Sequence, residues 1–132
     1  MIFSHITTEI GQVASISQSV PYQPDPLACY QQLAADSPYS LLLESAEIDS
    51  KDNLKSLMLI DAALRIECQG EQVSITAISE NGALLLPFIA GRLATQASIS
   101  GNNPLLLNFK RPDPLLDEDS KLVAPHPFDV LR

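Results

Sequence analysis

Cysteine and tryptophan are scarce or missing in this chain of 132 residues, which has no tryptophan and two cysteines. Cys29 and Cys68 lie far apart in the sequence and form no CxxC pair. This spacing excludes a paired-cysteine zinc motif and a dithiol redox motif. It is typical of reduced thiols in a cytosolic protein, and one long-range disulfide between the two stays open as an alternative.

Positive charge is also scarce. Eight Lys and Arg residues stand against sixteen Asp and Glu, which leaves a formal net charge of −8. Such a surface repels phosphate backbones and anionic membranes, so we expect neither a nucleic-acid nor a membrane partner. The longest apolar run, 83–91, is about half of a membrane span and contains Pro87. The N-terminus has neither the basic region nor the apolar region of a secretory signal, and we expect a cytoplasmic protein.

Recognisable catalytic motifs are missing as well. The sequence contains no GxGxxG, no P-loop and no GxSxG. His5 and His126 lie near opposite ends, without metal-ligand spacing. The acidic stretch 113–119 lacks the central glycine and alternating acids of a calcium loop, and we interpret it as a solvated loop. We therefore predict no catalytic residue and no metal site from these patterns, and we expect the chain to act by binding or as part of a larger assembly.

What the chain does have is 45% apolar residues and enough length for one domain with a buried core. Asp25-Pro26 predicts the start of a helix that runs to about Ala35. Period-two alternation on either side of Gly70 predicts a β-hairpin of 64–68 and 73–78.

The remaining segments complete an α+β fold with a mainly antiparallel sheet and two or three helices. The expected elements are a strand over 39–46, an exposed connection over 47–55, a strand or helix over 56–64, a helix over 79–93 limited or kinked by Pro87, a polar loop over 95–103, a strand over 105–109, and the first turn of a helix over 127–132.

One block resembles a known family. Leu42-Leu43-Glu44-Ser45 is followed after ten residues by Ser56, and this LLES-x10-S pattern is similar to a signature near the N-terminus of anthranilate synthase component I. The similarity is densest over 41–66, continues in order at 115–120 and 128–132, and covers about 25–132.

The resemblance implies an incomplete front part of a larger fold. Its implied organisation is an N-terminal strand or lead-in loop over 1–24, a tryptophan-sensing domain over 25–120, and a truncated link over 121–132 towards a missing catalytic domain. The full family enzyme is a lyase of tryptophan biosynthesis that converts chorismate to anthranilate and pyruvate. It uses Mg²⁺ and ammonia from a glutamine amidotransferase partner, component II, and tryptophan inhibits it by feedback. The resemblance places no catalytic or cofactor position within this chain, which lacks the catalytic region of the family and is therefore expected to be inactive alone.

The same resemblance implies that the LLES segment helps to bind L-tryptophan. An amino-acid ligand needs an acceptor for its ammonium, donors for its carboxylate and an apolar slot for its side chain. We expect Ser45 to contact the ligand directly and Lys55 to pair with its carboxylate. Glu44 faces the ammonium or holds the loop, Leu43 is a further candidate contact, and Ser56 closes the 46–55 connection or contacts the ligand.

Simpler interpretations stay open for the same residues. Ser45 also fits a turn residue at the end of a strand, and Lys55 an ordinary surface lysine. Leu41 and Leu42 fit the core. Two further functions stay open for the whole chain: the N-terminal part of aminodeoxychorismate synthase component I, and a stand-alone module that binds an amino acid.

Overall fold

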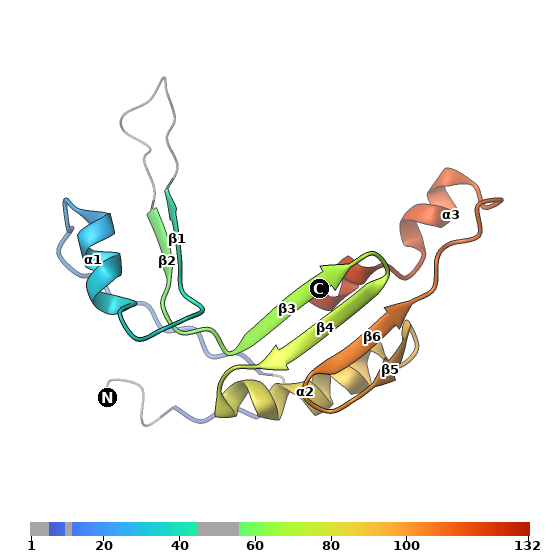
Figure 1. Ribbon diagram of the computed structural model, residues 1–132, viewed down its shortest axis with the longest axis horizontal. Helices are drawn as coiled ribbons and strands as arrows, with labels where there is room; N and C mark the ends of the chain where they lie inside the picture. The colour runs from blue at the N-terminus through green and yellow to red at the C-terminus, as the bar shows by residue number, and fades with distance from the viewer. Residues whose placement is uncertain (1–5, 10–11, 45–55) are drawn as a thin grey trace, which may run out of the picture. The chain divides into compact units, whose positions relative to one another are not determined.

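The computed structural model describes residues 6–9, 12–44 and 56–132 (Figure 1). Within it the chain divides into two compact units, one formed by Ser15–Ala62 and the other by Met1–Ala14 together with Ala63–Arg132. Residues 6–9 and 12–24 form neither helix nor strand. The Ser45 and Lys55 positions and the expected connection over 47–55 lie outside the described residues.

The helix of the first unit starts where the sequence predicted. Helix α1 spans Pro26–Leu33, and the carboxylate of Asp25 accepts a hydrogen bond of 2.9 Å from the backbone N–H of Ala28. This bond satisfies one of the free N–H groups of the first turn, and Pro26 has no N–H to satisfy. The helix ends at Leu33, slightly before the expected Ala35.

Two antiparallel strands complete the first unit. Strand β1 spans Leu41–Glu44 and strand β2 spans Ser56–Leu59. The sequence alone left 56–64 as strand or helix, and pairing with β1 decides for a strand over the first part of that segment. The hydroxyl of Tyr30 hydrogen-bonds Ser40 Oγ at 2.7 Å, which ties α1 to the residue before β1.

The second unit is built on a four-stranded antiparallel sheet with the order β3-β4-β6-β5. The expected hairpin is confirmed, with Gly70 at a φ of +60° in its turn, where a residue with a side chain would be strained. The strands are β3 Leu64–Gln69, β4 Gln72–Ala77, β5 Ala97–Ser100 and β6 Leu105–Phe109.

Helix α2, Glu80–Leu93, packs on one face of this sheet, as Figure 1 shows. Ser79 Oγ caps it by accepting a 3.0 Å hydrogen bond from the N–H of Gly82. The helix continues through Pro87, which is exposed, so that water can reach the carbonyl of Ala83 left without a helical partner. The core between helix and sheet consists of Val73, Ile75, Leu86, Leu93, Leu105, Leu107 and Phe109.

Two segments differ from the expectation. The stretch 95–103, predicted as a loop, contains β5, which exists because it pairs with β6 from Ala97 opposite Phe109 to Ser100 opposite Leu106. The acidic stretch was predicted as a loop throughout, but Asp117 caps helix α3, Glu118–Val123.

The chain ends in a 3-10 helix, η2, which spans Pro127–Leu131. His126 precedes it, and its ring Nδ1 accepts a 3.2 Å hydrogen bond from the N–H of Phe128. The expected helical turn at 127–132 is therefore present, in a tighter form than an α-helix.

An ion pair fastens the end of β6 to the turn of the hairpin. Arg111 Nε donates a hydrogen bond to Glu71 Oε1, and the N–H of Phe109 donates to the Glu71 carbonyl at 2.9 Å. The guanidinium lowers the pKa of the Glu71 carboxyl below its ordinary value, and the carboxylate raises the pKa of Arg111. The Arg111 side chain is largely exposed and that of Glu71 partly so, and an ion pair open to water contributes little to stability.

The architecture confirms the predicted α+β class with antiparallel sheets. Three α-helices accompany two separate sheets in the described part of the chain. Cys29 and Cys68 are free thiols, and no disulfide joins them. None of the helices described is long and apolar enough to cross a membrane.

Candidate functional site

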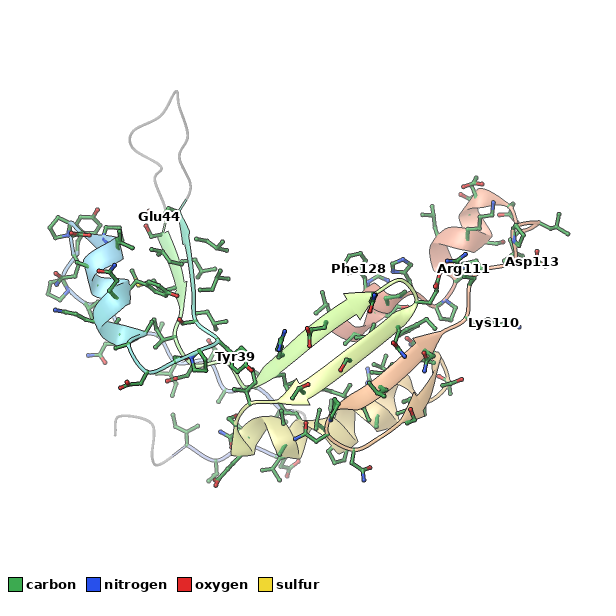
Figure 2. The ribbon with its side chains drawn as sticks, in the orientation of Figure 1. Tyr39, Glu44, Lys110, Arg111, Asp113 and Phe128 are labelled. Carbon is green, nitrogen blue, oxygen red and sulfur yellow. The ribbon has the colours of Figure 1, made fainter. Side chains whose placement is uncertain are left out.

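The β1–β2 pair brings two of the predicted site residues together. Glu44 is the last residue of β1, and Ser56, the first of β2, lies directly opposite. Figure 2 shows Glu44 at one end of β1, with Tyr39 just before the other end. Both strands form because Leu41, Leu42 and Leu43 meet an equally apolar run in β2, and such cross-strand pairs stabilise a sheet.

Glu44 and Ser56 are in contact. Ser56 Oγ donates to Glu44 Oε1 at 3.4 Å, a long hydrogen bond between two exposed side chains. A carboxylate oxygen accepts more than one hydrogen bond, so Glu44 keeps acceptor capacity for an ammonium group. The carboxylate and the Ser56 hydroxyl thus lie next to each other at one end of the paired strands.

Leu43 lies on the other face of the hairpin. Residues directly opposite each other in an antiparallel pair share a face, and successive residues alternate between faces. Leu43 therefore shares its face with Leu57, whereas Glu44 and Ser56 occupy the opposite one. A ligand that touches both Leu43 and Glu44 has to sit across the end of the hairpin.

The five predicted site residues thus fall into three groups. Glu44 and Ser56 are adjacent and bonded, Leu43 is on the reverse face, and Ser45 and Lys55 lie outside the described residues. The tryptophan-binding role of all five stays a prediction.

A cavity in the second unit was not anticipated from the sequence. It has a volume of about 780 Å³ and an apolar wall that includes Phe88, Leu93 and Val130. Arg92 of α2 contributes a guanidinium, and Arg132 is paired with Asp129 at 3.1 Å. The signal available in the sequence was the spacing of the lining residues along α2, which places Phe88 and Arg92 on one side of the helix.

The carboxylates of the described residues do not assemble a metal site. No group of three or more His, Cys, Asp or Glu side chains in 6–9, 12–44 and 56–132 is placed to hold a metal ion. Asp117 serves the fold instead: the N–H and hydroxyl of Ser120 donate to it and lower the pKa of its carboxyl.

Comparison with known proteins extends the similarity across nearly the whole chain. No protein-family model matches it. The anthranilate synthase component 1 of Vibrio parahaemolyticus is 43% identical over 94% of this chain, and that of Vibrio cholerae is 47% identical over 89%. The chain spans about a quarter, 23%, of the length of each, at the N-terminal end. The protein of the same name from Citrobacter freundii is 48% identical over 84% of this chain, which covers 75% of that relative.

Proposed function

Because the chain belongs to the anthranilate synthase component 1 family, we propose that it serves as the N-terminal, tryptophan-sensing part of an enzyme that converts chorismate to anthranilate and pyruvate. The observation that carries this proposal is the 43–48% identity to proteins of that name over 84–94% of the chain. The chain is expected to bind the end product and not to perform the chemistry, since no catalytic motif lies in its sequence.

The hairpin end supports an amino-acid site. Glu44 presents an exposed carboxylate beside the Ser56 hydroxyl, and a carboxylate is the natural acceptor for the ammonium of L-tryptophan. Ser45 directly follows Glu44 in the sequence, and Lys55 directly precedes Ser56. In our proposal Lys55 holds the ligand carboxylate and Ser45 donates or accepts a hydrogen bond.

The rest of the enzyme is proposed to supply what this chain lacks. In our proposal Mg²⁺ and the chorismate site belong to the region beyond the N-terminal quarter of the relatives that this chain matches. Ammonia would come from a glutamine amidotransferase, component II, as the partner subunit.

A tryptophan titration tests the sensing role in the chain as it exists. The chain carries a uniform ¹⁵N label, L-tryptophan is added up to millimolar concentration, and L-phenylalanine is the control ligand. We expect selective shifts of the amide signals of Glu44, Ser45 and Ser56, since these are residues that we assign to the proposed site. Shifts that are equal for both amino acids, or confined to the second unit, would contradict the assignment.

The substitution Ser45→Phe tests the same site through its effect on feedback inhibition. This chain replaces the matched region of the Vibrio cholerae component 1, and anthranilate formation is measured with and without L-tryptophan. A phenylalanine at residue 45 should block the site, so that inhibition is relieved and turnover is largely kept. Ser98→Phe is the control, because Ser98 is exposed on β5 in the other unit. If the Ser45→Phe chimera and the unsubstituted chimera are inhibited by the same concentration of L-tryptophan, Ser45 is not a ligand contact.

A further inference from the structure

Over the described strands 41–44 and 56–59, one face of the β1–β2 pair consists only of leucine side chains. The register places Leu41 opposite Leu59 and Leu43 opposite Leu57, and the alternation of side chains puts all four on one face. Each of these residues exposes between 45% and 65% of its surface. We call Leu41, Leu43, Leu57 and Leu59 the leucine face.

The opposite face of the hairpin is different. Leu42 and Met58 are half-buried there, and Glu44 with Ser56 gives that face a polar end. The leucine face has no charged or hydroxyl side chain. An isolated two-stranded hairpin is marginally stable in water, and contiguous exposed apolar side chains mark a contact surface. The leucine face is therefore the side of the strand pair that we expect to be buried against another apolar surface.

We infer that the leucine face docks against an apolar surface of the component 1 polypeptide outside the region that this chain matches. The inference rests on the proposed function. Relatives of 43% and 47% identity carry this region as about a quarter of their length, so roughly three quarters of each is available to supply the cover. Linked in one polypeptide, the two surfaces meet at a high effective concentration.

A second copy of this chain is the less favourable occupant. Each copy carries a formal net charge of −8, and two such chains repel each other. An uncharged leucine face offers no compensating ion pair across a twofold interface. Docking on the rest of a component 1 polypeptide needs no second acidic copy.

Thiol reactivity tests the docking. The free chain of 132 residues carries Leu57→Cys together with Cys29→Ser and Cys68→Ser. In the chimera, the same substituted chain replaces the matched region of the Vibrio cholerae component 1. Maleimide labelling at residue 57 is followed by mass spectrometry of its peptide. Leu41→Cys, on the same face, repeats the test in case Leu57→Cys disturbs the strand. Gln31→Cys, exposed on α1, calibrates the reaction in both proteins.

Labelling at residue 57 should be at least about tenfold slower in the chimera than in the free chain, because a packed interface must open before the thiol reacts. Equal rates in a chimera that still forms anthranilate would overturn the docking and leave the proposed function standing. Protection in the free chain that fades on dilution would assign the face to a second copy and also overturn it. A protected thiol in a chimera that forms no anthranilate would support the docking and count against the proposed function.

Discussion

Replacing Gly82 by alanine should destabilise the second unit, although alanine is normally the better helix residue. Gly82 is buried in the first turn of α2, and a Cβ there would lie 1.9 Å from the carbonyl oxygen of Ala63 and 2.8 Å from its carbon. That oxygen also accepts a 2.9 Å hydrogen bond from Ile78. Because the obstacle is backbone, either the helix must move away from the start of β3 or the hydrogen bond must break.

The magnitude follows from two opposing effects. Overpacking a tight contact costs about 1–3 kcal/mol, and a lost backbone hydrogen bond costs roughly 1 kcal/mol more. The gain in helix propensity returns only about 0.5–1 kcal/mol. We expect a net loss of about 2 kcal/mol in the free energy of unfolding.

Gly91→Ala is the matched control in the same helix. A Cβ at Gly91 meets no atom within 4 Å, so only the propensity gain remains, and the variant should be more stable by roughly 0.5–1 kcal/mol. Urea unfolding, followed by far-ultraviolet circular dichroism and by amide hydrogen exchange in β4, measures both. If the two substitutions change the unfolding free energy in the same direction and to the same extent, the close approach of α2 to Ala63 is wrong.

Three further predictions concern the core, a helix cap and the ligand. Leu107→Ala removes a side chain with 0% exposure and should cost about 2–5 kcal/mol, whereas Leu122→Ala, at an exposed position, should cost less than about 0.5 kcal/mol in the same urea assay. Folding lowers the pKa of the Asp117 carboxyl. The stability that its cap contributes is therefore fully present above the pKa of this group in the unfolded chain, and it is lost as the pH falls through the lower pKa of the folded state. Carbon chemical shifts of α3 should show the helix unwinding on acidification in the native chain, and Asp117→Asn, which still caps, should show no such titration. In the chimera, Lys55→Ala should weaken tryptophan inhibition by roughly 1.5–3 kcal/mol if Lys55 holds the ligand carboxylate, and an unchanged inhibition curve would place Lys55 on the surface.

The parts of the fold that sequence reasoning predicted are those with local causes. The β3–β4 hairpin follows from alternation and a glycine that tolerates a positive φ, and both signals lie within a dozen residues. The start of α1 follows from Asp25 and Pro26, which act on the first turn only.

The elements that sequence reasoning missed depend on distant partners, or on neighbouring residues that are compatible with both a loop and a helix. Strand β5 has serines at 98 and 100, which face away from the core and give the segment the composition of a loop. It becomes a strand because β6 supplies its hydrogen-bonding partners, and no local sequence pattern within β5 predicts that pairing. Asp117 was assigned to a solvated loop because acids cluster there, yet an acid directly before a helix is also a cap.

The candidate site could be predicted only in part for a similar reason. Alternation along one strand separates Leu43 from Glu44, and this much was available from the sequence. That Ser56 lies opposite Glu44 depends on the register of β1 with β2, which the sequence did not fix because 56–64 fitted a helix equally well. The leucine face follows from the same register.

The strand order also determines the point during synthesis at which the second unit can complete its folding. Strand β6 is made last of the four, yet it lies inside the sheet between β4 and β5. It brings Leu105, Leu107 and Phe109, three of the seven buried core residues. Until β6 leaves the ribosome, α2 has only the β3–β4 hairpin to pack against, and β5 lacks the strand with which it pairs. We therefore expect a nascent chain halted before residue 105 to be cut readily by protease and one that has released residue 109 to resist it.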